Sequence, residues 1–293
     1  MNNQQIAIIG GGASGLLASI LLARSGKKIT LFEKNHKLGR KILATGNGKC
    51  NISNSNISSK NFYTTNKDFL EYILNQFDYL KFKKLFLELG LEIIENKDGK
   101  AYPSTLQASS VVNLLVYEAK RLNVEFVLDA NVEDISYTSD KFQINFNNTT
   151  RSFDKTIIAS GTKAMPKLGS CDSGFDFATY FGHTIIEPFA SLVQLCSDDK
   201  KIYDLNGVKV DCEVTLEVDK QFCTRASGDV LFTNYGLSGN AILDISREAS
   251  YNLSIQSGVV VKIDIFPSIN KDNLTSQLLK RLQNSNNKDN TFG

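Results

Sequence analysis

Residues 10–15 read Gly-Gly-Gly-Ala-Ser-Gly, a spacing that fits the pattern G-x-G-x-x-G. In this pattern Gly10 permits a tight turn, Gly12 leaves room for a diphosphate beside the backbone, and Gly15 lets a helix pack closely on a strand. The unpaired N–H groups of the first helical turn then attract an anion. The spacing therefore predicts a binding site for the diphosphate of a dinucleotide.

The residues around the glycines predict the elements that such a site requires. Residues 6–9 are a short apolar run typical of a strand buried on both faces, and residues 16–24 have the pattern of a buried helix. Residues 29–33 predict a second strand, and it ends in Glu33, where a carboxylate can bind the ribose hydroxyls. The charge of Glu33 disfavours a 2′-phosphate, and hence NADP. The alternative is a glycine-rich strand–helix turn that binds no ligand.

NAD and FAD both use such a turn, so other residues must decide between them. Residues 38–51 read LGRKILATGNGKCN, which resembles the signature of the HI0933-like flavoproteins, also called the YhiN family or aminoacetone oxidase-like FAD-binding enzymes. The resemblance covers essentially the whole chain and includes residues 102–109, 157–161, 166–170 and 231–239. The chain departs from the family pattern in having Ser160 for threonine, Asn234 for histidine and Asn240 for proline.

The resemblance implies an α/β fold, with a Rossmann-like domain of the glutathione reductase type that binds flavin adenine dinucleotide (FAD). It also implies that the glycine turn holds the ADP half, that Arg40 and Lys41 lie beside the phosphates, and that the loop from Thr45 runs along the flavin. The alternative for Arg40 and Lys41 is a solvated basic turn. Val132 is expected to contact adenine through its backbone. The expected cofactor-binding residues are Gly10, Gly12, Ala13, Ser14, Gly15, Glu33, Lys34, Arg40, Lys41, Thr45, Gly46, Asn47, Gly48, Val132, Ser160 and Gly161.

Cys50, at the end of this loop, has two interpretations. It is a candidate catalytic residue, either a proton donor or a redox thiol near the flavin, with Lys49 beside it to lower its pKa. Alternatively it only packs, since free cysteine is among the most buried residue types. The chain has five cysteines without a C-x-x-C pair and two histidines, so no metal site is expected. His183 is expected to be a structural turn residue.

The patterning predicts two domains, residues 1–189 and residues 190–293. In the first, helices are expected near 68–76, 79–89, 107–122 and 173–182, and strands at 124–128, 131–137, 141–146 and 153–159. The second is expected to be β-rich and to wall the substrate site. Its predicted strands are 207–218, 221–224, 229–233 and 258–266, and its predicted helices are 238–249 and 271–284.

Composition and the ends of the chain narrow the class of protein. Lys plus Arg number 33 against 31 for Asp plus Glu, so net charge favours neither a nucleic-acid protein nor an acidic tail. The absence of a long apolar stretch and of a signal-peptide pattern, with unpaired cysteines, predicts no membrane span and a cytoplasmic location. Family members usually continue with a glycine-rich segment that returns over the flavin. From its absence we expect a fragment or a shortened protein that retains FAD more weakly.

These features predict an FAD-dependent oxidoreductase that transfers hydride through flavin N5. The resemblance implies a uracil base of ribosomal RNA as a substrate, with dihydrouridine as the product. The alternatives are an oxidase of small amines such as aminoacetone, a nicotinamide-only dehydrogenase, and a non-catalytic flavin-binding protein. Because the chain has no second clear G-x-G-x-x-G pattern, NAD(P)H is expected to visit transiently or not at all.

Overall fold

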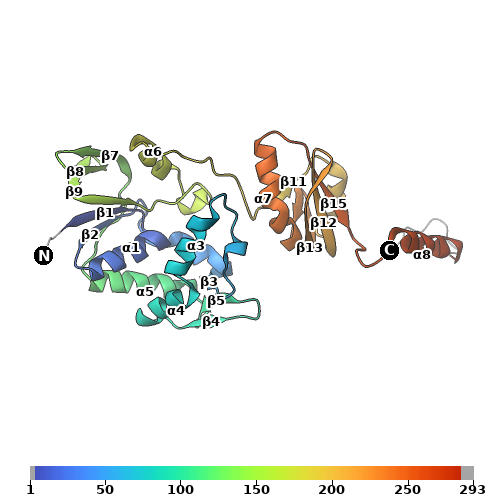
Figure 1. Ribbon diagram of the computed structural model, residues 1–293, viewed down its shortest axis with the longest axis horizontal. Coiled ribbons are helices and arrows are strands. Elements are labelled where there is room, and N and C mark those ends of the chain that lie inside the picture. The colour runs from blue at the N-terminus through green and yellow to red at the C-terminus, as the bar shows by residue number, and fades with distance from the viewer. Residues whose placement is uncertain (1–3, 285–293) are drawn as a thin grey trace. The chain divides into compact units, whose positions relative to one another are not determined.

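The computed structural model describes residues 4–284 and divides the chain into two units, Met1–Ile185 and Ile186–Gly293. This division lies slightly before the predicted boundary at residue 190. Figure 1 shows the elements of each unit, which are described separately below. Among residues 4–284, no helix has both the length and the hydrophobicity that crossing a bilayer requires.

A four-stranded parallel sheet, in the order β10-β1-β2-β6, forms the centre of the first unit. In β1, Ile6 and Ile8 enter one apolar core, whereas Ala7 and Ile9 enter another. This alternation buries the strand on both faces, as its unbroken apolar run predicts. The strands are β1 (Gln5–Ile9), β2 (Lys28–Phe32), β6 (Glu125–Val127) and β10 (Lys155–Ile158).

Each face of this sheet has its own covering layer (Figure 1). Helices α1 (Ala13–Arg24) and α5 (Ala108–Arg121) cover the face that carries Ile6 and Ile8. A three-stranded antiparallel sheet covers the other face, where aromatic rings pack edge-on against Phe32 of β2. Its strands are β7 (Val132–Thr138), β8 (Lys141–Phe146) and β9 (Thr149–Phe153).

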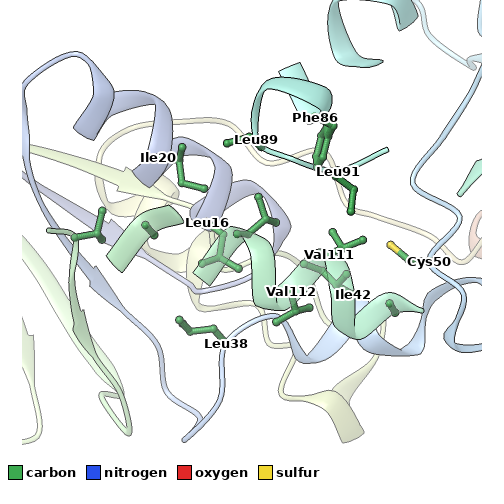
Figure 2. Packing of buried hydrophobic residues seen from close by; sticks show 14 of the residues in the cluster. Leu16, Ile20, Leu38, Ile42, Cys50, Phe86, Leu89, Leu91, Val111 and Val112 are labelled. Atoms are coloured by element: carbon green, nitrogen blue, oxygen red, sulfur yellow. The ribbon is translucent and has the colours of Figure 1, made fainter. Parts of the chain in front are cut away.

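The segment between β2 and α5 adds short elements that border the first face. They extend its core with Ile42, Phe86 and Cys50, as Figure 2 shows. These elements are α2 (Arg40–Ala44), β3 (Ser53–Asn54), α3 (Lys67–Gln76), α4 (Tyr79–Glu88), β4 (Ile93–Glu95) and β5 (Lys100–Pro103). After β10, a 3-10 turn at Pro166–Leu168 precedes α6 (Ser173–Tyr180).

The second unit is an antiparallel sheet in the order β11-β14-β13-β12-β15, with its core under one helix. Helix α7 (Asn240–Ser254) packs Ile242 and Ile245 against the buried side chains of β12 and β13. The strands are β11 (Leu195–Cys196), β12 (Lys209–Val218), β13 (Gln221–Thr233), β14 (Gly236–Ser238) and β15 (Val259–Asp264). Helix α8 (Lys271–Asn284) follows.

Two predictions about strands were wrong in detail. Residues 221–224 and 229–233 were expected to be separate strands, but they belong to the single strand β13. Of the four intervening residues, Ala226, Ser227 and Gly228 have weak strand propensity. They nevertheless pair in register with Cys212–Val214 of β12, and this pairing overrides the local preference. The structure also adds β9, which the sequence analysis did not separate from the strand that became β10.

A buried carboxylate ties α1 to α5. Glu118 of α5 accepts a hydrogen bond from Arg24 Nη2 at 2.7 Å and another from Arg121 Nε at 2.7 Å. These hydrogen bonds, from Arg121 foremost and then Arg24, lower the pKa of Glu118 to about 2 although burial acts in the opposite direction. The two helices that support the glycine turn are therefore joined by charge as well as by apolar packing.

Candidate cofactor site

A cavity of about 440 Å³ opens at the carboxyl ends of β1, β2 and β10. Backbone hydrogen bonds hold its edges together: Gly10 N–H donates to Phe32 O at 2.8 Å, and Ala159 N–H donates to Ile9 O at 2.8 Å. This is the crevice in which open parallel sheets bind their ligands. It brings together loops that lie far apart in the sequence.

The glycine turn forms the floor of this cavity, and each glycine of the motif meets a different neighbour. Gly10 has φ +109°, and a Cβ there would lie 2.5 Å from Ala159 O. A Cβ on Gly15 would lie 1.9 Å from Gly10 O, so Gly15 packs beneath the turn and does not line the cavity. A Cβ on Gly12 would meet no atom within 4 Å. The open space at Gly12 is where a diphosphate can approach the backbone.

The N-terminus of α1 is available to an anion. Its N-cap, Gly12, offers no side-chain hydrogen bond, and the first turn contains no acidic residue. Ala13 and Ser14 line the cavity from this turn. The unpaired N–H groups and the helix dipole together favour a diphosphate here.

Glu33 lines the cavity from the end of β2. Its Oε2 accepts a hydrogen bond from Gly11 N–H at 2.8 Å, and its Oε1 accepts one from Asn35 N–H at 2.9 Å. Asn35 Nδ2 also donates to Oε1, at 2.5 Å. A carboxylate has about four acceptor sites, so these three bonds leave about one for a ribose hydroxyl. Glu33 thus lies at the cavity, and its contact with the ribose stays a prediction.

We expect Glu33→Gln to weaken binding of FAD and of ADP by about 10-fold, since a charge-assisted hydrogen bond contributes about 1.5–3 kcal/mol. The loss of charge should also reduce the preference for ADP over ADP that carries a 2′-phosphate. Both effects can be measured by titration calorimetry, with Glu71→Gln on α3 as an exposed control. Unchanged affinity for ADP in Glu33→Gln would contradict the assignment of this residue to the ribose.

Four basic side chains line the cavity. Arg40 Nη1 donates to Asn35 Oδ1 at 2.5 Å, so its guanidinium is held beside the loop that carries Glu33. Lys34, Lys37 and Lys41 also line the cavity, and Glu33 is the one acidic side chain among the lining residues of the described chain. This charge distribution favours an anionic ligand and supports the predicted position of Arg40 and Lys41.

The remaining walls come from two segments after β6. Val132 lines the cavity together with Ala130 and Asn131, at the end expected to hold adenine. Ser160 and Gly161 follow β10 and line the opposite wall. The buried Ser160 Oγ has no hydrogen-bond partner among the described residues. A Cβ on Gly174 would lie 2.4 Å from this oxygen, so the hydroxyl lies against the first turn of α6.

The structure adds lining residues that the sequence analysis did not assign to the site. Leu168–Ser170 lay in a segment noted only for its family resemblance, and Cys171 was given no part in the site. Burial opposes ionisation of Cys171, but hydrogen bonds with Ser173 and the charge of Lys34 outweigh it, so the pKa of this thiol is lowered. The residues next to Cys171 in the sequence give no signal of this contact.

The loop from Thr45 divides into a wall and an exposed rim. Thr45 lines the cavity, whereas Gly46, Asn47 and Gly48 are exposed and line neither this cavity nor the neighbouring one around Cys50. Gly46 has φ +56°, and a Cβ there would lie 2.6 Å from Asn51 N. Contact of Gly46, Asn47 and Gly48 with the flavin therefore stays a prediction.

Cys50 is buried in a second cavity of about 300 Å³. Its backbone has φ +58°, a conformation that is uncommon for residues other than glycine and recurs at functional sites. Burial raises the pKa of the thiol, and a hydrogen bond with Thr45 only partly opposes this. The pKa is thus raised, where Lys49 was expected to lower it, and Cys50 is a protonated thiol at neutral pH.

The parallel sheet, its glycine turn and the carboxylate at the end of β2 define a dinucleotide-binding domain of the Rossmann-like class. Comparison with known proteins identifies the group within this class. The chain belongs to the HI0933-like family, whose Rossmann domain matches residues 4–283. This is a family of FAD-dependent oxidoreductases, and FAD is the cofactor that the family binds.

Curated relatives match most of this chain. A 3-dehydro-bile acid delta(4,6)-reductase from Clostridium scindens is 33% identical over 90% of this chain and 65% of its own length. Ribosomal RNA dihydrouridine synthases from Haemophilus influenzae and Escherichia coli are 29% and 30% identical over 94% and 92% of this chain, and 69% and 66% of their own lengths. The chain thus spans about two thirds of the length of these relatives.

Proposed function

We propose that this chain reduces a carbon–carbon double bond conjugated with a carbonyl group. The names of its relatives describe two such reactions, on a uracil base of ribosomal RNA and on an unsaturated ring of an oxidised bile acid. We put a uracil of ribosomal RNA first as the substrate, because two of the relatives are ribosomal RNA dihydrouridine synthases. An unsaturated cyclic ketone is the second candidate, favoured by the relative with 33% identity.

The observation that carries this proposal is the position of a buried, protonated thiol next to the dinucleotide cavity. When bound, FAD supplies hydride transfer at its N5 atom. Residues of the glycine turn and Glu33 anchor the ADP half and so fix the position of the cofactor. Reduction also requires a proton at the neighbouring carbon, and Cys50 Sγ holds one in a cavity that adjoins the first at Thr45.

The balance of the reaction requires a reductant as well. The substrate gains one hydride and one proton, and a reduced pyridine nucleotide that visits transiently supplies the electrons. The second unit is proposed to contribute to substrate binding.

The first experiment identifies the cofactor and the substrate. The purified protein should be yellow, and the released cofactor should have the mass of FAD. After anaerobic reduction, addition of a uracil-containing ribosomal RNA fragment should restore the oxidised flavin spectrum and yield dihydrouridine. Reoxidation by a cyclic enone alone would favour the second candidate. Formation of hydrogen peroxide from aminoacetone, with no reduction of either double bond, would refute the proposal.

We expect Cys50→Ala to slow reduction of the double bond by about 100-fold or more, because general acid catalysis typically contributes that much. Reduction of the flavin itself should be unaffected. Since the thiol has a raised pKa, the wild-type rate should be constant at neutral pH and fall once the pH exceeds that pKa. Stopped-flow absorbance across a pH series measures both effects.

The matched control for this variant is Cys212→Ala, which removes an equally buried thiol in the second unit. It should keep the wild-type rate and pH profile. If Cys50→Ala shows the same rate and the same alkaline decline as the wild type, Cys50 is a packing residue.

A further inference from the structure

The carboxamide of Asn35 lies between two charged side chains of the first cavity, Glu33 and Arg40. Its Nδ2 donates to Glu33 Oε1 at 2.5 Å, and its Oδ1 accepts a hydrogen bond from Arg40 Nη1 at 2.5 Å. Because an ionised carboxylate only accepts and a guanidinium only donates, a single orientation of the amide satisfies both partners. The amide therefore links a negative group to a positive one, and its orientation is fixed by them.

The position of Asn35 is fixed by three loops. Its backbone N–H donates to Glu33 Oε1 at 2.9 Å, and its carbonyl accepts a hydrogen bond from Asp129 N–H at 3.3 Å, after β6. A Cβ on Gly169 would lie 2.7 Å from Asn35 Nδ2, so the loop after β10 packs against the amide. The loops after β2, β6 and β10 thus meet at Asn35, which itself lines the cavity.

The amide stands between two groups that readily form bidentate ion pairs, a carboxylate and a guanidinium. Glu33 accepts its hydrogen bonds from Gly11 and Asn35. Arg40 donates to Asn35 and, at 3.5 Å, to Lys167 O. In a direct pair, Arg40 would occupy the acceptor position of Glu33 that is left for a ribose hydroxyl, and fewer of its donors would remain for a phosphate.

We infer that Asn35 is a positioning residue for the adenosine end of the site. It holds Arg40 away from Glu33, so that the carboxylate keeps an acceptor for a ribose hydroxyl and the guanidinium keeps donors for a phosphate. This inference rests on the binding of FAD that the proposed function requires. It adds a residue that neither the glycine turn nor the carboxylate at the end of β2 implies.

Analogues of ADP without ribose hydroxyls provide the test. Apo-protein and the apo-form of Asn35→Ala are titrated by calorimetry with ADP and with 2′,3′-dideoxy-ADP. We expect the wild type to prefer ADP by about 10-fold or more, as a charge-assisted hydrogen bond to the ribose implies. In Asn35→Ala this preference should fall below about 3-fold, because Arg40 then pairs with Glu33. An equal loss of affinity for both ligands, with the preference retained, would overturn the inference.

A second substitution separates positioning from a merely structural role. If Asn35→Ala acts by letting Arg40 reach Glu33, then removing the guanidinium should free the carboxylate again. The double variant Asn35→Ala with Arg40→Met should therefore regain a preference for ADP over the dideoxy analogue of about 10-fold, although both ligands bind more weakly. If the double variant shows no regained preference, Asn35 does not act by holding these charges apart.

Asn145→Ala is the matched control. Asn145 of β8 is half-buried like Asn35, and its amide also joins two side chains, donating to Asp134 Oδ2 at 3.3 Å and accepting from Thr150 Oγ1 at 2.5 Å. It does not line the first cavity. This variant should keep the wild-type affinity for both ligands, and thermal unfolding of each apo-protein shows that the variants are folded.

The outcomes separate this inference from the proposed function. If the wild type binds ADP and the dideoxy analogue equally, Glu33 does not bind the ribose, and the inference falls with that contact. If Asn35→Ala keeps the preference for ADP while FAD still supports reduction of the double bond, only the role of Asn35 is wrong. If the preference is lost and regained as expected but neither substrate is reduced, the role of Asn35 stands and the proposed reaction fails.

Discussion

Gly12→Val should lower the affinity for FAD by about 100-fold or more, a change of about 2.7 kcal/mol, while leaving the thermal stability of the apo-protein unchanged. A Cβ at Gly12 meets no protein atom within 4 Å, so the substitution does not disturb the fold. The backbone there has φ −79°, which any residue can adopt. The added side chain occupies only the space that the diphosphate requires. Fluorescence titration with FAD and calorimetric unfolding of the apo-protein measure the two quantities.

Two variants serve as controls for Gly12→Val. Gly12→Ala, with a smaller side chain, should give an intermediate loss of affinity. Gly15→Ala should instead destabilise the fold, because its Cβ would lie 1.9 Å from Gly10 O. If Gly12→Val keeps its affinity for FAD, the diphosphate does not lie over this residue.

Glu118→Ala should lower the free energy of unfolding by about 2–4 kcal/mol, since it leaves Arg24 and Arg121 without their buried partner. The expected value is below that of a fully buried pair because side-chain exposure is 30% for Arg24 and 56% for Arg121. Denaturant unfolding of the apo-protein gives the change. The control is Glu88→Ala, whose 4.0 Å ion pair with Lys84 is exposed and should contribute less than about 0.5 kcal/mol.

The pH dependence of this contribution has a definite sign. The pKa of Glu118 is lowered to about 2 in the folded protein, below the value of about 4.3 for an unperturbed glutamate. The stabilisation is therefore complete above the unfolded pKa and is lost as the pH falls toward about 2. The difference in stability between wild type and Glu118→Ala should shrink over this range. A difference that is constant from neutral pH to pH 3 would contradict the role of the charge.

The glycine turn and its supporting elements are the part of the fold that local sequence predicts best. Gly10, Gly12 and Gly15 each act through backbone geometry, and their spacing fixes the strand before them and the helix after them. The position of Glu33 is predicted by the same strand–helix–strand pattern, because the carboxyl end of a parallel strand must face the crevice. These positions require no knowledge of distant residues.

Other parts of the site depend on contacts that no local pattern records. Cys171 and Lys37 line the cavity only because the loops after β2 and β10 meet there. The sequence left two interpretations of Cys50, and its left-handed backbone and its place beneath α5 come from the packing of α2, α4 and α5. Strand β13 likewise acquires its full length from β12 and not from its own residues. Tertiary pairing decides in each of these cases.

The hydrogen bonds around Glu33 have a consequence for the kinetics of cofactor binding. Gly11 N–H and Asn35 donate to Glu33, Arg40 donates to Asn35, and Gly39 N–H donates to Gly11 O. The loops that are expected to receive the adenosine and the phosphates are therefore preorganised by the protein alone, and little conformational entropy should be lost when the coenzyme binds. Association at this end of the site should be a single second-order step, without a slow isomerisation of the protein.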